Sequence, residues 1–166
     1  VNNAGVNYKG MPNATESEYD LVLNTNLKGA FFMSQLFGKY MIENKICGNI
    51  LNIASASSLR PADSAYTLSK WGLRGLTLGL AKALGKDGIT VNGIAPGPTA
   101  TPMMLKNGET NMNLDRVLLG RYIMPEEISN MAVVLVSDMG RSIMGDIIYM
   151  TGGAGILTFD DVKYSF

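Results

Sequence analysis

The sequence predicts an α/β protein in which helices cover both faces of a mainly parallel sheet. Short apolar segments alternate along the chain with longer segments whose apolar residues recur at helical spacing, which is typical of strand–helix–strand units. Hydrophobic residues make up 46% of the chain and charged residues 17%, a balance typical of a globular domain. Because 166 residues is the size of one domain, we expect residues 1–166 to form a single unit.

Local signals set the expected boundaries of the elements. Val1 to Gly5 has the pattern of a strand end that runs into a turn. Thr15, followed three residues later by Glu18, forms the pattern of a capping box. Pro125, followed by two acidic residues, suits the first turn of the last helix. The expected helices cover about 15–24, 26–45, 65–86 and 125–137, and the expected strands cover 49–55, 89–95 and 146–150.

The segment 99–122 has no clear period and is rich in Met, Asn and Gly. A segment of this length without regular structure tends to be a lid or a binding loop in a compact domain, so we expect a lid over 99–122. Its methionines Met103, Met104 and Met112 suit an adaptable, partly apolar pocket. Filling of the core explains these methionines equally well.

The composition excludes several classes of function. Lys and Arg total 14, as do Asp and Glu, and without a basic stripe we expect no binding to nucleic acid. No run of about 18 apolar residues predicts a membrane span, and no signal-peptide pattern opens the sequence, so we expect a cytoplasmic protein. With no His and the single Cys47, we expect neither a Ser-His-Asp triad nor a metal site.

The residues Tyr66 and Lys70 are the leading candidates for chemistry. They are four residues apart at the start of the expected helix 65–86, so both side chains project from the same face. A nearby cation favours the phenolate and lowers the pKa of a phenol. In a chain without His, this pair is a way to build an acid or base, although Tyr and Lys one turn apart are also common on helix surfaces.

Three further positions are candidates at the carboxyl edge of the expected sheet, where open α/β sheets bind ligands. Ser55 ends a strand and can donate to a substrate oxygen, with Ser57 and Ser58 as rivals. Asn26, at the start of the helix 26–45, either caps that helix or takes part in a proton or water relay. The turn Pro96-Gly97, with Thr101 shortly after it, either binds a flat amide-bearing ring or is only a turn.

The helix 66–86 is apolar around most of its circumference. No charged residue lies between Arg74 and Lys82, and such a helix is covered on more than one side. One side can face the sheet, and the other predicts a partner, most simply a second copy. We expect a homo-oligomer, a dimer or a tetramer, formed through helices 26–45 and 66–86.

Taken in order, these motifs resemble the short-chain dehydrogenase/reductase family over nearly the whole chain. The matching segments are Asn2-Asn3-Ala4-Gly5, Asn26-Leu27-Lys28-Gly29, Asn52-Ile53-Ala54-Ser55, Tyr66-Thr67-Leu68-Ser69-Lys70, Val91-Asn92-Gly93-Ile94-Ala95-Pro96-Gly97 with Thr101, Pro125-Glu126-Glu127 and Thr151-Gly152-Gly153. The resemblance implies a doubly wound, Rossmann-like sheet. It also implies NAD- or NADP-dependent interconversion of a small-molecule carbonyl and an alcohol.

The resemblance also implies a role for each matching residue. Tyr66 corresponds to the general acid/base, and Lys70 to the residue that lowers the Tyr66 pKa and holds the nicotinamide ribose. Ser55 corresponds to the residue that orients the substrate oxygen, and Asn26 to the residue that supports the water relaying protons through Lys70. The positions that correspond to cofactor contacts are Asn3, Ala4, Gly5, Tyr66, Lys70, Pro96, Gly97, Thr99 and Thr101.

The sequence departs from the family pattern in three places. The loop between Ser55 and Tyr66 is shorter than in many members, and Thr151 replaces an Asp that often precedes the final glycine pair. The glycine-rich turn that seats the pyrophosphate is missing, together with the residue that selects NAD or NADP. We therefore expect N-terminal βα units in a longer polypeptide, and keep a truncated, catalytically silent subunit of the same fold as the alternative.

Overall fold

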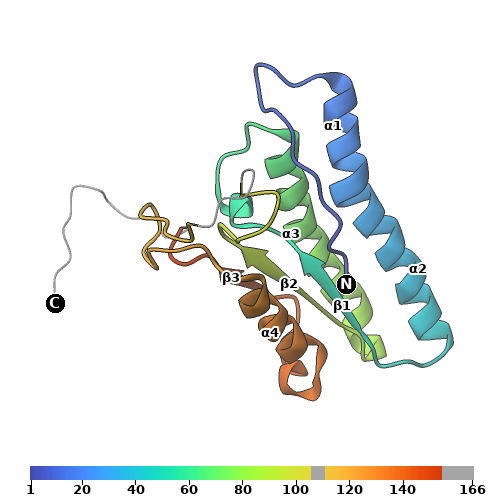
Figure 1. The fold of residues 1–166 in the computed structure, drawn as a ribbon. Helices are drawn as coiled ribbons and strands as arrows, with labels where there is room; N and C mark the ends of the chain where they lie inside the picture. Colours follow the sequence, from blue (N-terminus) through green and yellow to red (C-terminus); the bar gives the residue numbers. More distant parts are fainter. Residues whose placement is uncertain (106–110, 155–166) are drawn as a thin grey trace.

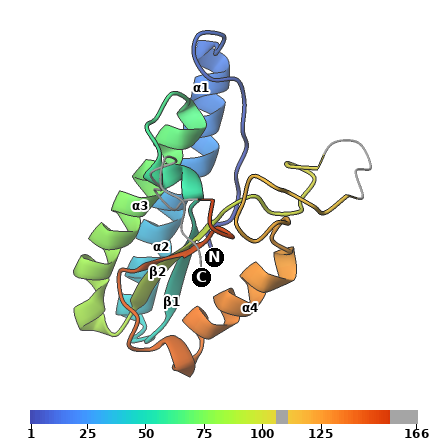
Figure 2. The ribbon, with the colours of Figure 1, turned by 90° about the vertical axis from the view of Figure 1, so that its left-hand side faces the viewer.

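A computed structural model describes residues 1–105 and 111–154, in which helices cover both faces of a three-stranded parallel sheet (Figure 1). The strands are β1 (Asn49–Ile53), β2 (Thr90–Pro96) and β3 (Ile147–Met150), and they lie in the order β1-β2-β3. The sheet lies between α2 (Gly29–Glu43) and α3 (Ala65–Leu84) on one side and α4 (Pro125–Val136) on the other (Figure 2). The predicted α/β architecture with a parallel sheet is confirmed.

The start of the chain adds one residue pair to the free edge of β1. Asn2 forms a parallel bridge with Asn52: its N–H donates to the Leu51 carbonyl at 2.8 Å, and its carbonyl accepts from the Ile53 N–H at 3.0 Å. The sequence predicts a strand end over Val1–Gly5, and the structure places a single bridged residue there. This bridge still fixes where the following loop begins.

The predicted break between the first two helices is wrong. The capping box of Thr15 and Glu18 does begin α1 (Glu16–Leu23). The chain then continues through a π-helical turn, η1 (Asn24–Lys28), into α2 (Gly29–Glu43). A π turn accommodates extra residues in the helix without ending it, and here it carries the buried side chain of Asn26.

The helix α3 (Ala65–Leu84) closely matches its prediction. Ser64 is its N-cap and accepts from the Thr67 N–H at 3.3 Å. A short 3-10 turn, η3 (Gly85–Asp87), follows, and Gly88 with φ 75° then turns the chain toward β2. Two further 3-10 turns, η2 (Ala56–Leu59) and η4 (Asp138–Gly140), follow β1 and α4.

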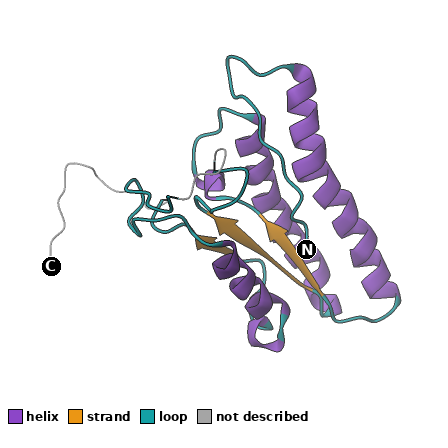
Figure 3. Cartoon of the chain, viewed as in Figure 1, coloured by secondary structure: helices purple, strands orange, loops and turns teal. Residues whose placement is uncertain are grey.

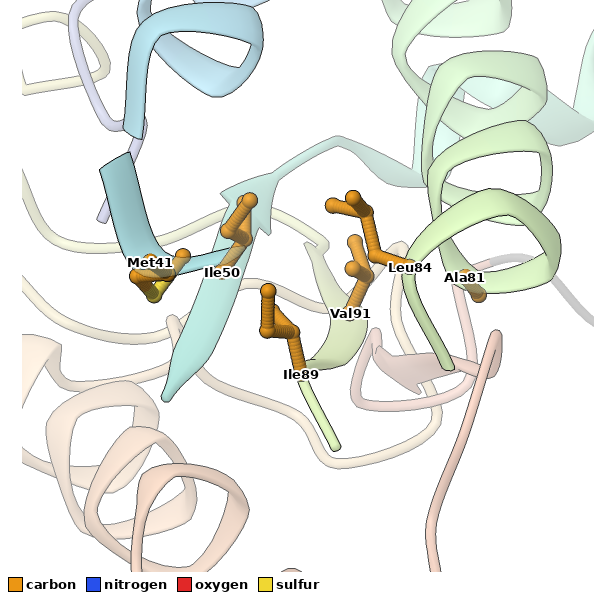
Figure 4. Close-up of a cluster of buried hydrophobic side chains, with 6 residues drawn as sticks. All are labelled: Met41, Ile50, Ala81, Leu84, Ile89 and Val91. Carbon is orange, nitrogen blue, oxygen red and sulfur yellow. The ribbon is translucent and has the colours of Figure 1, made fainter. Parts of the chain in front are cut away.

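The hydrophobic core has clusters of buried residues on both faces of the sheet. Alternate residues of β1 and β2 point to opposite faces, so Ile50 and Val91 meet α2 and α3 while Leu51 and Ile94 meet α4. The cluster on the α3 side is shown in Figure 4 and consists of Met41, Ile50, Ala81, Leu84, Ile89 and Val91.

A buried polar network joins the start of the chain to β1, α2 and α3. The Asn2 Nδ2 donates to Asn52 Oδ1 at 2.8 Å and to Ser34 Oγ at 2.9 Å, and the Asn52 Nδ2 donates to Thr77 Oγ1 at 2.9 Å. Asn52 and Thr77 are completely buried. Because buried amides are costly when unpaired, this network fixes how these four segments fit together.

The expected lid 99–122 is drawn largely as loop (Figure 3), and residues 106–110 lie outside the described part. Its two ends are held together: Ala100 N–H donates to the Ile123 carbonyl at 2.9 Å, and Asn113 forms an antiparallel bridge with Arg121. Arg121 then makes an ion pair of 2.8 Å with Glu127 at the start of α4. Among the described residues, no helix combines the length and apolar character needed to span a membrane.

Candidate active site

The candidate site lies at the carboxyl edge of the sheet, where β1 ends and α3 begins. Tyr66 and Lys70 are in the first turns of α3, and the Lys70 Nζ lies 5.6 Å from the centroid of the Tyr66 ring. The same Nζ donates to the Ile53 carbonyl at the end of β1, at 2.8 Å. The four-residue spacing therefore places both side chains on the side of α3 that faces β1, as the sequence predicts.

Lys70 is a buried cation with unused donors. Its side chain is 4% exposed, and this burial lowers its pKa to about 8. An ammonium group has three hydrogens to donate, and Ile53 is the one acceptor found for it among residues 1–105 and 111–154. Lys70 is therefore mostly charged at pH 7, with donors left over for a ligand.

The pKa of Tyr66 moves in the opposite direction from the prediction. Burial raises it above 10, and the Ser55 side chain lowers it by less than burial raises it. In this structure Tyr66 is a neutral phenol at pH 7.

Of the three serines in the turn after β1, Ser55 is the one that interacts with Tyr66. Ser55 is the N-cap of η2, and its Oγ accepts from the Ser57 N–H at 3.1 Å. The Ser58 hydroxyl is completely buried and is bonded to the Ser55 carbonyl and to Tyr149. This arrangement favours Ser55 over Ser58 as the residue that meets a substrate.

Asn26 does not cap a helix, which corrects one of the two interpretations of this residue. Its amide brackets Val6: Oδ1 accepts from the Val6 N–H at 2.8 Å, and Nδ2 donates to the Val6 carbonyl at 2.9 Å. Nδ2 also donates to Ser69 Oγ at 3.1 Å. Asn26 therefore fixes the loop after Asn2 against α3, and a relay role for it remains a prediction.

The segment Asn3-Ala4-Gly5 passes close to these groups. A Cβ at Gly5 would lie 3.6 Å from Asn26 Oδ1 and 3.8 Å from Lys70 Nζ. The backbone of Gly5 thus adjoins the ammonium group that has unused donors. A hydroxyl-bearing ligand such as a ribose fits this place, because the cation offers donors beside an exposed stretch of backbone at Asn3 and Ala4.

The turn after β2 lies at the same edge of the sheet. Gly97 is pressed against Thr151, since a Cβ there would lie 2.7 Å from the Thr151 carbonyl oxygen. The hydroxyls of Thr99 and Thr101 bond locally, to the carbonyls of Gly97 at 3.0 Å and Thr99 at 3.4 Å. The structure therefore brings together Asn26, Ser55, Tyr66, Lys70 and Gly5. Among the described residues, Pro96, Gly97, Thr99 and Thr101 make no hydrogen bond to this group.

Sequence reasoning missed the residues that hold the turn η2 in place. Trp71 Nε1 donates to the Arg60 carbonyl at 2.8 Å, and Arg74 donates to the Ser58 carbonyl at 3.4 Å. Tyr149 reaches the same turn from β3. Nothing in the sequence pattern of β3 singles out Tyr149, because its partner is distant along the chain.

A pocket of about 570 Å³ opens at the carboxyl end of β3, next to η2. None of Asn26, Ser55, Tyr66 and Lys70 lines it, so the pocket adjoins the site and is separate from the acid/base pair. The lining residues are Leu59, Leu119, Ile123, Glu127, Tyr149, Met150, Thr151, Gly152 and Gly153.

Comparison with known proteins gives matches over nearly the whole chain. A family model described as enoyl-(acyl carrier protein) reductase matches residues 1–155. A (2S)-[(R)-hydroxy(phenyl)methyl]succinyl-CoA dehydrogenase subunit of Thauera aromatica is 38% identical over 160 residues, 94% of this chain. A 3-oxoacyl-[acyl-carrier-protein] reductase of Thermotoga maritima is 37% identical over 158 residues, 92% of this chain. The chain spans 64% of the length of each of these two relatives.

The solved structures agree with the sequence comparisons. A 4-hydroxyisoleucine dehydrogenase complexed with NADH matches with a TM-score of 0.86 and 31% identity. The match covers 92% of this chain and 66% of that protein. The arrangement of strands and helices described above is thus shared with a dehydrogenase that holds a nicotinamide cofactor.

Proposed function

The chain belongs to the short-chain dehydrogenase/reductase family, and we propose that it carries the acid/base half of an NAD- or NADP-dependent oxidoreductase. The reaction interconverts a small-molecule carbonyl and an alcohol by hydride transfer. The observation that carries the proposal is the meeting of Tyr66, Ser55 and Lys70 where β1 ends. The nicotinamide, when bound, supplies or accepts the hydride.

Tyr66 is the proton donor in reduction and the acceptor in oxidation. Its raised pKa keeps the phenol protonated at pH 7, which suits donation to a carbonyl oxygen. Ser55, whose side chain lies near enough to the phenol to lower its pKa, is the second candidate to donate to the same oxygen. Two donors aimed at one developing oxyanion is the arrangement that stabilises such a charge in water-excluded sites.

Lys70 holds the ribose of the cofactor and faces the phenol. Burial lowers its pKa to about 8, so the ammonium is charged at pH 7 and can donate to ribose hydroxyls. Once a proton leaves Tyr66, this cation near the ring favours the resulting phenolate. Asn26 keeps the loop at Val6 in place beside it, and by the family resemblance supports a water that relays protons.

The cofactor is NAD or NADP, bound along two backbone segments. Gly5 adjoins Lys70. By the family resemblance, Asn3, Ala4 and Gly5 would form one part of the cofactor site, and Pro96, Gly97, Thr99 and Thr101 after β2 would form the other. The 4-hydroxyisoleucine dehydrogenase was solved with NADH, which supports NAD.

Acyl thioesters are the substrate class that the named relatives support. One of them is named for a succinyl-CoA derivative and the other for an acyl carrier protein. The lid 99–122 contributes Leu119 to the largely apolar pocket that adjoins the site. Simple ketones, sugars and steroids are the substrates with which acyl thioesters should be compared in the same assay.

A homo-oligomer formed through α2 and α3 completes the proposal. Large apolar side chains remain exposed along these helices; they include Phe31, Phe32, Leu36, Phe37 and Tyr40 on α2 and Leu68, Trp71 and Leu78 on α3. Gly75 and Gly79 leave open space on α3, with no atom within 4 Å of a Cβ built there. A second copy that packs helices against these faces would bury this surface.

Two experiments test the proposal. One is calorimetric titration with NADH and NADPH, and the other measures consumption of the reduced cofactor across a panel of carbonyl substrates. Binding with turnover supports the oxidoreductase. The alternative is a catalytically silent subunit that associates through α2 and α3. That alternative predicts no heat of binding even at millimolar cofactor.

A further inference from the structure

The turn η2 that follows Ser55 is tied to β3 through one buried serine. Ser58 is 0% exposed, and its Oγ lies 2.8 Å from the Ser55 carbonyl and 3.2 Å from the Tyr149 hydroxyl. A serine hydroxyl has one hydrogen to donate, and the carbonyl accepts it. The Tyr149 hydroxyl is therefore the donor to Ser58.

Tyr149 is itself rigidly placed. It pairs with Ala95 across the parallel ladder of β2 and β3, and its side chain packs against Ala54 and Ala95. Ala54 immediately precedes Ser55. A side chain anchored on the third strand thus reaches the turn that follows the first strand.

The other restraints on this turn come from α3 and act beyond Ser55. Trp71 bonds to the Arg60 carbonyl and Arg74 to the Ser58 carbonyl. Only the Ser58 hydroxyl links the carbonyl of Ser55 itself to a side chain outside the turn, among the hydrogen bonds of residues 1–105 and 111–154.

We propose that Tyr149 is a positioning residue that sets the orientation of Ser55 through the Ser58 hydroxyl. The inference rests on the proposed function, because Ser55 must meet the substrate oxygen for its orientation to affect the rate. Without the Tyr149 hydroxyl, the Ser58 hydroxyl loses the donor that holds it, and its bond to the Ser55 carbonyl is less firmly oriented. The Ser58 N–H, at 3.0 Å, remains as the second partner of that carbonyl. The Ser55 hydroxyl then spends less time facing Tyr66.

Steady-state kinetics of Tyr149→Phe, Ser58→Ala and the double variant test this relay. Each single variant is expected to lower kcat about fivefold, the change in rate that one lost neutral hydrogen bond corresponds to, with KM for the dinucleotide unchanged. The double variant should be no slower than Ser58→Ala alone, because both act through one hydroxyl. Independent, multiplying effects would overturn the relay, and so would a Tyr149→Phe variant as fast as the parent.

Two control variants separate positioning from a general loss of stability. Tyr19→Phe removes a hydroxyl from a half-exposed tyrosine on α1. Ser129→Ala removes a serine hydroxyl that donates to the carbonyl three residues earlier, at 3.0 Å, the same local bond that Ser58 makes. Both should keep the parent kcat, whereas a fall in kcat that follows the melting temperature in all variants would contradict a positioning role.

Amide hydrogen exchange at Ser57 provides a readout that needs no turnover, because this N–H donates to the Ser55 Oγ. Faster exchange in Tyr149→Phe and Ser58→Ala, but not in Tyr19→Phe, is expected. If the parent chain shows no turnover, the proposed oxidoreductase function fails while this exchange still decides the positioning role. Unchanged exchange at the Ser57 N–H in Tyr149→Phe and Ser58→Ala would overturn the positioning role of Tyr149.

Discussion

Replacement of Lys70 by Met should stabilise the chain at neutral pH while removing the proposed ribose contact. The folded state lowers the Lys70 pKa from 10.5 to about 8 by burial. This difference, about 2.5 pKa units, corresponds to about 3.4 kcal/mol that the charged form costs the folded state at pH 7. The lost bond to Ile53 offsets about 1 kcal/mol of that gain, so Lys70→Met should raise the free energy of unfolding by about 2 kcal/mol.

The pH dependence gives this prediction a sign that can be checked. Between pH 8 and 10.5 the unfolded chain binds a proton at Lys70 that the folded chain has lost, so the parent gains stability as the pH rises. Relative to Lys70→Met, the parent should gain about 2.5 kcal/mol between pH 7 and pH 10. Urea unfolding of both proteins at the two pH values measures the difference. A Lys70→Met variant less stable than the parent at pH 7, or a constant difference across pH, would refute the buried-cation account.

Three further predictions concern stability and assembly. Glu127→Gln should lower the melting temperature at pH 7, because Glu127 pairs with Arg121 and the pKa of its carboxyl falls to about 2. The stability from this pair is present above pH 4.5 and is lost as the pH falls through 2. If thermal scans show the same difference in melting temperature between parent and variant at low pH, the ion pair is contradicted. Asn52→Ala should lower the free energy of unfolding by about 2 kcal/mol in urea titrations, because it removes one acceptor of the Asn2 amide and the donor to the buried Thr77 hydroxyl. A loss below about 0.5 kcal/mol would show that the network is dispensable. Phe37→Glu on α2 should lower the molar mass of the assembly measured by light scattering. Val133→Glu on α4, which is also about half exposed, should keep the mass of the parent. The same mass for both variants would remove α2 from the interface.

Much of the fold follows from local pattern. The three strands and α3 are predictable because apolar runs between turn residues leave few alternatives. Ser64 caps the start of α3, and Gly88 ends the 3-10 turn that follows it. The π turn at Asn24–Lys28 is not predictable in this way. No Gly or Pro lies within it, and its cause is tertiary: it buries the Asn26 amide against Val6 and Ser69.

The candidate site, like the fold, is only partly predictable from the sequence. The spacing of Tyr66 and Lys70 places them on one face of α3, because helix geometry alone requires it. Their pKa values depend on burial and on the Ile53 carbonyl, which no spacing encodes, and for this reason the expected lowering of the Tyr66 pKa is wrong. Tyr149 and Ser58 are 91 residues apart, so only the folded chain shows that they meet.

The measurement that bears most directly on the proposed function is cofactor oxidation by the parent and by Tyr66→Phe with the same carbonyl substrate. The variant keeps the ring beside Lys70 and loses only the hydroxyl, so dinucleotide binding should be retained while kcat falls by at least 100-fold, the usual contribution of a positioned general acid. Equal rates for the two proteins would contradict the assignment of the proton transfer to Tyr66.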